Sequence, residues 1–372
     1  MLIGVPKERA ANETRVAASP DSVKKMIKAG HQIQVQTGAG LAAGFSDQAY
    51  LDAGATPADS VLGADIVLCV NAPTGPAIAE LKTNSIVIGM FDPYRNEELD
   101  AFAQAGATAF AMELLPRTLS RAQNMDVLSS QANLAGYKAV IMAAETYGRP
   151  FPMYMTSAGT VKPARVLVLG VGVAGLQAIA TAKRLGAVVE ASDLRPAAKE
   201  QVESLGGKWL DVPMSDEEKE KAKSTGGYAW TPSEDYIKDQ AAVVDKAASN
   251  ADIVITTAQI PGRNAPRLIH KATLDKMRRG SVLIDMAASS GGNVEGTVMG
   301  ETVTTDGGVL IVGPANIPAS LAAQSSELYA NNLWNFLQTL FNDEGALALS
   351  DDDEIQKALK VTEPGSVLLQ KR

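Results

Sequence analysis

Three glycines and one aspartate near the middle of the chain have the residue types and the spacing that bind a dinucleotide. Gly170, Gly172 and Gly175 form the pattern G-x-G-x-x-G directly after an apolar run. The first glycine permits a tight strand-to-helix turn, the second lets the backbone approach a pyrophosphate, and the third lets the helix pack closely on the strand. Asp193 follows about 20 residues later, where a carboxylate can accept hydrogen bonds from ribose hydroxyls and would repel a 2′-phosphate. The pattern therefore predicts a site for NAD in preference to NADP.

A second polar segment, residues 120–139, has two interpretations. Its polar side chains recur near helical spacing and would share one helix face. They are Asp126, Ser129, Ser130, Asn133 and Tyr137, preceded by Arg121 and Gln123. One interpretation is a solvated helix face with an Asp or Ser N-cap. The other is a polar wall beside a nicotinamide ring, where it would hold the carboxamide and the adjoining ribose. The periodicity alone leaves both interpretations open.

Other kinds of catalytic site have little support in the sequence. Cys69 is the only cysteine and lies in the apolar run VLCVNA, so we expect a buried, inert thiol rather than a nucleophile. His31 and His270 are far apart in the chain, and neither belongs to a cluster with metal-ligand spacing. We therefore expect no metal site.

Length and composition describe a well-buried globular protein. The chain has 372 residues, 46% of them hydrophobic and 20% charged, and this length predicts two domains. A net charge of −8 argues against nucleic acid as a direct partner. A single cysteine fits a reducing cytoplasm. Neither the N-terminus nor the uncharged run 307–326, which prolines interrupt, resembles a signal peptide or a membrane span, so we expect a soluble chain.

Apolar runs of strand length alternate with helical patterns, which predicts parallel sheets with helices on both faces. The expected fold class is α/β, with two doubly wound, Rossmann-like domains joined by long helices over 126–147 and 320–341. Ligands of such folds bind at the carboxyl ends of the strands, here in an interdomain cleft. The expected domains are residues 1–135 plus 320–372, a discontinuous N-terminal domain, and residues 136–319, the NAD-binding domain.

Two further segments carry expectations of their own. Residues 211–234 are polar and glycine-containing, and we expect a long loop of the kind that forms lids. The tail is acidic over residues 351–354, and we expect it to end without a packed element.

Several segments of the chain resemble those of a known family. Five segments occur in order: RAQNMDVLSSQANLAGY, TSAGTVKPARVLVLGVGVAGLQAIATAKRLGA, KEQVESLGG, GGYA and TTAQIPG. Together they resemble the NAD(H)-binding domain of the α subunit of proton-translocating NAD(P) transhydrogenase, and the resemblance extends from IGVPKER over nearly the whole chain. It implies an Si/Re-specific enzyme that passes hydride from NADH to NADP held by a separate NADP(H)-binding domain. It also implies proton movement through a membrane domain absent from this chain, a homodimer, and a peripheral place at the cytoplasmic face of a bacterial inner membrane.

The resemblance also implies roles for individual residues. The matches to positions around the nicotinamide and its ribose are Gln123, Asp126, Ser129 and Tyr137, with either Arg121 or Arg117 as the nicotinamide-side arginine. Which of the two arginines matches that position stays undecided, because the family usually has one residue fewer before its Ser-Arg-Ala-Gln element. The matches to pyrophosphate and adenosine contacts are Val173, Asp193, Leu194 and Arg195. Gly227 and Tyr228 match the tip of a mobile loop, and Gln240 and Gln259 match further cofactor contacts, the last through its backbone.

Alanine dehydrogenase is the main alternative hypothesis, because that family shares the two-domain plan and the early PKE…RV segment. Its chemistry needs a cation for the substrate carboxylate, a histidine acid/base and a carboxylate near the nicotinamide. At the aligned positions this chain has Cys69, Asp92 and Ser289, and a serine cannot take up a proton at neutral pH. Hydride passage between two nicotinamide rings needs positioning rather than a protein acid or base, so the sequence favours the transhydrogenase. A third hypothesis is a nucleotide-sensing module that binds NAD without passing hydride on.

Overall fold

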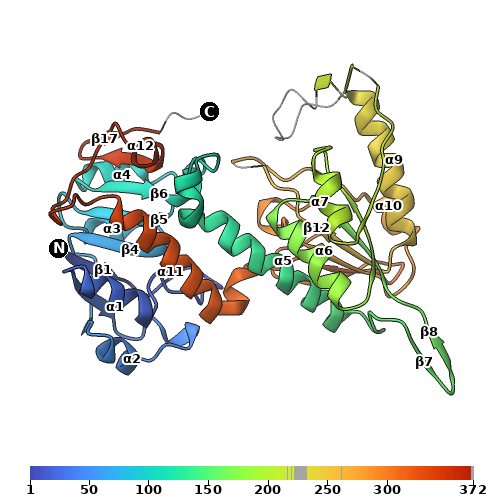
Figure 1. Ribbon diagram of the computed structural model, residues 1–372, viewed down its shortest axis with the longest axis horizontal. Coiled ribbons are helices and arrows are strands. Elements are labelled where there is room, and N and C mark those ends of the chain that lie inside the picture. The colour runs from blue at the N-terminus through green and yellow to red at the C-terminus, as the bar shows by residue number, and fades with distance from the viewer. Residues whose placement is uncertain (216, 219, 222–232, 261, 370–372) are drawn as a thin grey trace. The chain divides into compact units, whose positions relative to one another are not determined.

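The computed structural model describes residues 1–372 except 216, 219, 222–232, 261 and 370–372. The chain divides into two compact units. The first unit comprises Met1–Gln131 with Pro318–Arg372, and the second comprises Ala132–Ile317. In each unit helices surround a mostly parallel sheet (Figure 1). The predicted fold class, α/β with two doubly wound, Rossmann-like domains, is confirmed.

The sheet of the first unit has the strand order β17-β16-β6-β5-β4-β1-β2-β3. The chain adds β2 and β3 on one side of β1 and then β4 to β6 on the other, and all these neighbours pair in parallel. Two antiparallel strands extend the β6 edge. The strands are β1 (Leu2–Val5), β2 (Gln32–Gln36), β3 (Thr56–Ala58), β4 (Ile66–Asn71), β5 (Ile86–Met90), β6 (Thr108–Ala111), β16 (Lys360–Glu363) and β17 (Ser366–Val367).

Helices cover both faces of this sheet because its central strands are apolar on both sides. On β4, for example, Leu68 belongs to the core formed with α1 and α11, whereas the next residue, Cys69, belongs to the core formed with α3 and α4. The helices are α1 (Pro20–Lys28), α2 (Asp47–Asp52), α3 (Pro76–Ala79), α4 (Leu99–Gln104), α11 (Ala322–Gln338) and α12 (Glu354–Leu359).

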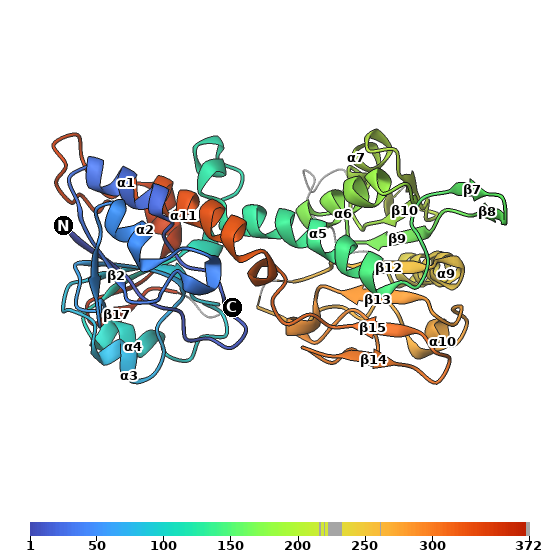
Figure 2. The ribbon, with the colours of Figure 1, turned by 90° about the horizontal axis from the view of Figure 1, so that it is seen from below.

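The sheet of the second unit repeats this winding, with the order β11-β10-β9-β12-β13-β15-β14. Figure 2 shows the strands in this sequence, from β10 uppermost to β14 lowermost. All neighbours pair in parallel except β14, which is antiparallel to β15. The strands are β9 (Arg165–Leu169), β10 (Val188–Ser192), β11 (Lys208–Trp209), β12 (Ile253–Thr256), β13 (Val282–Asp285), β14 (Thr302–Thr304) and β15 (Leu310–Val312).

Two helical layers enclose the second sheet in the same manner. On β9, Val168 packs in the core formed with α5, α6 and α7, whereas Leu169 packs in the core formed with α9 and α10. The helices are α5 (Val127–Thr146), α6 (Val173–Arg184), α7 (Ala198–Ser204), α9 (Glu234–Asn250) and α10 (Lys271–Leu274). Gly136 of α5 lies against α6, because a Cβ there would come within 2.1 Å of the Ala174 carbonyl oxygen.

The structure confirms the two long helices, as α5 and α11, and corrects the tail. The expectation that the tail ends without a packed element is wrong, since β16 pairs with β6 and Ile355, Leu359 and Val361 are fully buried. The sequence analysis also missed a two-stranded hairpin, β7 (Tyr154–Thr156) and β8 (Gly159–Val161). Among the described residues, no helix combines the length and apolarity needed to cross a membrane.

Candidate functional site

The glycine-rich turn joins β9 to α6 in the second unit. Gly170 has a φ of +92°, a conformation that glycine adopts without strain, and Gly172 is the N-cap of α6. A Cβ on Gly175 would lie 2.0 Å from the carbonyl oxygen of Gly170, so a side chain there would push α6 away from the turn. A Cβ on Gly172 would meet none of the described residues within 4 Å. Open space therefore lies beside a helix N-terminus, where backbone N–H groups bind phosphate.

Asp193 follows β10 and is hydrogen-bonded directly to this turn. Its Oδ2 accepts a hydrogen bond from the Val171 N–H at 2.6 Å, and its Oδ1 accepts one from the Arg195 N–H at 2.8 Å. The Arg195 guanidinium also donates to the carbonyl oxygen of Val171 at 3.0 Å. Its hydrogen bonds to Asp193 outweigh burial and raise the pKa of Arg195. The acid and the arginine thus form one fixed group beside the predicted pyrophosphate position.

The other predicted nucleotide contacts of the second unit are spread over several elements. Val173 opens α6, Tyr137 is exposed on α5, and Gln240 is half-buried on α9. Leu194 packs against a small apolar cluster around Tyr236. The predicted loop tip, Gly227 and Tyr228, lies outside the described residues.

The loop after β12 is hydrogen-bonded to the glycine-rich turn. The Thr257 hydroxyl donates to the carbonyl oxygen of Gly170 at 2.9 Å, two residues before the exposed Gln259. The fully buried Asn293 bonds to both the N–H and the carbonyl of Ala258, at 3.1 and 2.9 Å. The sequence analysis missed Asn293, because nothing local marks an asparagine that bonds to a distant loop. These contacts hold the backbone around Gln259 next to the turn.

In the first unit, the structure joins three of the predicted residues into one polar cluster. Oδ1 of Asp126 accepts the N–H of Ser129 at 2.8 Å, which confirms the N-cap interpretation for the start of α5. Oδ2 accepts the Ser129 hydroxyl at 2.7 Å and Nε of Arg117 at 2.8 Å. Burial raises the pKa of Asp126, but hydrogen bonds from Ser129 and Arg117 outweigh it, and the net shift is downward. Gln123 is exposed in the 3₁₀ turn just before this cluster.

Arg117 and Arg121, the two candidates for the nicotinamide-side arginine, have different environments. Arg117 also donates through Nη2 to the Ser129 hydroxyl at 2.8 Å, so it belongs to the Asp126 cluster. Arg121 instead forms a paired ion bridge with Asp353, with two N···O distances of 2.9 Å. Ser130 is turned toward α11, where its hydroxyl donates to Asn332 at 2.7 Å. The polar helix face is therefore narrower than the spacing suggested.

The residues at the alanine dehydrogenase positions do not form an acid/base group. Cys69 is fully buried, as expected, and burial raises the pKa of its thiol well above the usual value, with Glu8 and Glu113 adding to the rise. Asp92 and Ser289 are exposed in separate units.

Comparison with known proteins agrees with this architecture. Residues 4–135 match the family model of the alanine dehydrogenase/PNT N-terminal domain, and residues 139–369 match that of the C-terminal domain. The chain is 47% identical to the first segment of the NAD(P) transhydrogenase α subunit of Rhodospirillum rubrum, over 99% of this chain and 98% of that protein. It is 28% identical to alanine dehydrogenase of Bacillus subtilis, over 96% of this chain and 90% of that protein.

A solved structure extends the similarity to three dimensions. The crystal structure of transhydrogenase from Sinorhizobium meliloti superposes with a TM-score of 0.89 and 48% identity, covering 99% of this chain and all of that one. A structure of L-alanine dehydrogenase gives a TM-score of 0.80 at 27% identity, covering 99% of this chain and 97% of that one. The chain belongs to the alanine dehydrogenase/PNT family and, within that family, to the NAD(P) transhydrogenase α subunits.

Proposed function

We propose that this chain is the NAD(H)-binding component of a proton-translocating, Si/Re-specific NAD(P) transhydrogenase. The observation that carries the proposal is the bonded group of glycine-rich turn, Asp193 and Arg195, in a chain similar along its whole length to transhydrogenase α subunits. The open space at Gly172 and the N-terminus of α6 fit a pyrophosphate. When bound, NADH supplies a hydride from C4 of its nicotinamide.

The chain's own residues would bind and orient the nucleotide. Val173 and the first turn of α6 hold the phosphates, while Asp193 with Leu194 and Arg195 holds the adenosine end. Gln123, Asp126 and Ser129 orient the nicotinamide end, with Arg117 fixing the carboxylate of Asp126 at 2.8 Å. Further contacts are Tyr137, Gln240 and the backbone at Gln259. The hydride acceptor is NADP+ on a partner domain, and proton translocation belongs to a membrane domain.

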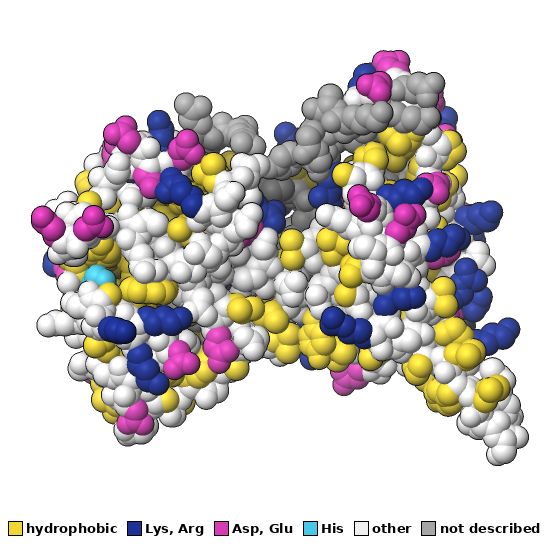
Figure 3. All heavy atoms as spheres, in the orientation of Figure 1, with side chains coloured by type: hydrophobic (Ala, Val, Ile, Leu, Met, Phe, Trp, Pro, Cys, Tyr) yellow, Lys and Arg dark blue, Asp and Glu magenta, His cyan; other side chains and the backbone are white. Residues whose placement is uncertain are grey.

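The proposal includes assembly as a homodimer attached peripherally to the cytoplasmic face of a bacterial inner membrane through its partner domains. An apolar hairpin supports the dimer. Met153, Tyr154 and Met155 are 61%, 45% and 77% exposed at the start of β7–β8, and Figure 3 shows the hydrophobic side chains gathered there. Exposed apolar side chains at one projecting element are typical of a protein interface.

A reconstitution tests the proposed reaction. The chain is mixed with the NADP(H)-binding domain of a transhydrogenase, and reduction of an NAD analogue by NADH is followed in the presence of NADP(H). Turnover above that of either protein alone supports the proposal, and its absence overturns it. Oxidation of NADH with pyruvate and ammonia alone would identify an amino-acid dehydrogenase instead.

A further inference from the structure

The loop after β12 lies at the point where the second sheet reverses its winding direction. The chain places β10 and β11 on one side of β9 and then β12 to β15 on the other. Folds of this type bind a dinucleotide across such a reversal, with one mononucleotide on each half of the sheet. Asp193 belongs to the half with β9 and β10, which the proposed function gives to the adenosine. The half that begins with β12 is therefore left for the nicotinamide mononucleotide, and its first loop contains Gln259.

The loop after β12 is held at several points by the loop after β13. The fully buried Asn293 uses both ends of its amide: Oδ1 accepts the Ala258 N–H at 3.1 Å, and Nδ2 donates to the carbonyl oxygens of Ala258 and Pro266 at 2.9 and 2.8 Å. The side chain of Gln259 donates to the carbonyl oxygen of Met286 at 3.1 Å. This bond engages the side chain, which agrees with a cofactor contact through the backbone of Gln259.

A buried carboxylate in turn holds the loop after β13. Asp285, the last residue of β13, is fully buried and accepts four hydrogen bonds, two from backbone N–H groups and two from threonine hydroxyls. The donors are Ala287 and Val294, at 3.0 and 2.9 Å, and Thr256 and Thr297, at 3.1 and 2.7 Å. The loop passes so close that a Cβ on Gly292 would lie 2.7 Å from Oδ2 of Asp285. Because Val294 follows Asn293 directly, Asp285 fixes the backbone that carries the Asn293 amide.

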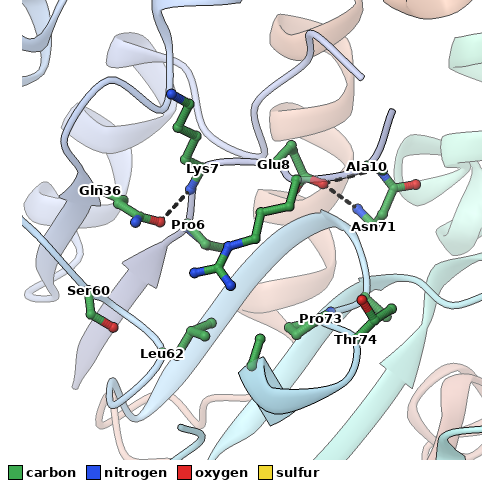
Figure 4. A pocket seen from close by; sticks show the side chains of 13 residues that line it. Pro6, Lys7, Glu8, Ala10, Gln36, Ser60, Leu62, Asn71, Pro73 and Thr74 are labelled. Atoms are coloured by element: carbon green, nitrogen blue, oxygen red, sulfur yellow. Dashed lines mark hydrogen bonds between the residues drawn. The ribbon is translucent and has the colours of Figure 1, made fainter. Parts of the chain in front are cut away.

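In the first unit a buried carboxyl also joins two loops at a winding reversal, but it does so from between them. The reversal lies between β1 and β4, and the pocket beside it has a volume of about 180 Å³ (Figure 4). Glu8, from the loop after β1, accepts the N–H groups of Val70 and Asn71 at the end of β4, at 2.6 and 3.1 Å. This volume is below the about 300–1,000 Å³ typical of pockets for drug-sized ligands, so no dinucleotide fits. Asp285 instead acts from β13, on the side of β12 away from β9, and does not fill the space beside Gly172.

We propose that Asp285 and Asn293 are positioning residues for the nicotinamide half of the bound nucleotide. Neither contacts the cofactor. Asp285 fixes the course of the loop after β13, and Asn293 transmits it to the backbone at Ala258 and Gln259. Such a network restrains a backbone contact before the ligand arrives, so that less ordering accompanies binding. The inference rests on the proposed function only in that the chain binds NADH, and it does not depend on the hydride acceptor.

Calorimetric titration of the full chain with NADH and with 5′-AMP, the adenosine half alone, tests the proposal. Asn293→Ala removes three hydrogen bonds to the loop after β12, and Thr297→Val removes a hydroxyl that Asp285 accepts. Thr297→Val keeps the shape of a partly buried side chain, so it tests the proposal even if Asn293→Ala fails to fold. The matched control is Thr273→Val on α10, which breaks a hydrogen bond of the same kind, 2.8 Å long, to Asp245 on α9.

The expected loss of NADH affinity is about tenfold in Asn293→Ala and about fivefold in Thr297→Val, with the affinity for 5′-AMP within about twofold in both. Thr273→Val should bind both ligands as the unmodified chain does. The inference is overturned if the variants that fold bind NADH as well as the control does. It is also overturned if NADH and 5′-AMP are weakened equally, because a purely structural role would affect both.

Two further outcomes separate this inference from the proposed function. If the unmodified chain does not bind NADH, both are overturned. If the variants lose NADH affinity as expected but the unmodified chain passes no hydride to a partner domain, the proposed function fails and the inference stands.

Discussion

Arg195 donates hydrogen bonds to both carboxylate oxygens of Asp193: Nε lies 2.9 Å from Oδ1 and Nη2 lies 3.1 Å from Oδ2. With the N–H groups of Val171 and Arg195 also bonded, all four acceptor positions of the carboxylate are used within the chain. Hydrogen bonds from a ribose would therefore share or replace bonds that Arg195 now makes. In the proposed function, the acid that selects the nucleotide is thus also the one that restrains the Arg195 guanidinium.

Asp193→Ala is expected to weaken NADH binding about tenfold, which corresponds to about 1.4 kcal/mol from a lost charge-assisted hydrogen bond. NADPH binding should improve, because the repelling charge is gone and Arg195 is released. Fluorescence titrations with NADH and NADPH measure both effects. In the double variant Asp193→Ala/Arg195→Ala the gain for NADPH should disappear. An unchanged preference for NADH would show that the acid does not contact the ribose.

Gln123→Asn is expected to slow hydride transfer by roughly a hundredfold, the scale of loss from a displacement of about 1 Å at a reacting centre. The dissociation constant for NADH should stay within twofold, because the side chain is exposed and, in the proposed function, only orients the ring end. Stopped-flow transfer rates and equilibrium titrations separate the two quantities. Gln104→Asn, an exposed glutamine on α4, is the matched control. Equal losses of rate and affinity would mean that Gln123 serves ground-state binding.

Arg117→Met is expected to raise the pKa of Asp126. Hydrogen bonds from Ser129 and Arg117 now hold this pKa below its usual value in spite of burial. The stabilisation they provide is present above the ordinary pKa and is lost as the pH falls through the depressed one. A pH profile of hydride transfer and of urea unfolding should therefore show its acid limb at higher pH in the variant. Arg121→Met, which breaks only the pair with Asp353, should leave the limb in place. If Arg121→Met shifts the acid limb of the profile and Arg117→Met does not, then Arg121, and not Arg117, controls the pKa of Asp126.

Met155→Ser is expected to weaken the homodimer, because this side chain is the most exposed apolar group of the β7–β8 hairpin. Sedimentation velocity over a range of concentrations gives the dimer dissociation constant. Met299→Ser, 56% exposed and outside the hairpin, should behave as the unmodified chain. A chain that is monomeric at every concentration, or equal dimerisation of both variants, would count against the hairpin interface.

The sequence was sufficient where the physical constraint is local. Each glycine of the G-x-G-x-x-G turn has its own steric reason, and the alternation of residues on β9 places neighbours in two different cores. The sequence was insufficient where the partner is distant. The pairing of β16 with β6 joins segments about 250 residues apart, and a sheet edge accepts any short segment of suitable residues. That Arg117 rather than Arg121 bonds to Asp126 depends on the course of the chain through the 3₁₀ turn, which spacing does not determine.

Direct passage of hydride from one nicotinamide to another is the central claim, and an isotope measurement tests it most directly. NADH carrying deuterium at both C4 positions is mixed, in a single turnover, with the chain and an NADP(H)-binding domain loaded with NADP+. The NADPH formed is then analysed by mass spectrometry. The account predicts one deuterium in every NADPH molecule, with none lost to water. NADPH without the label, or no NADPH at all, would contradict it.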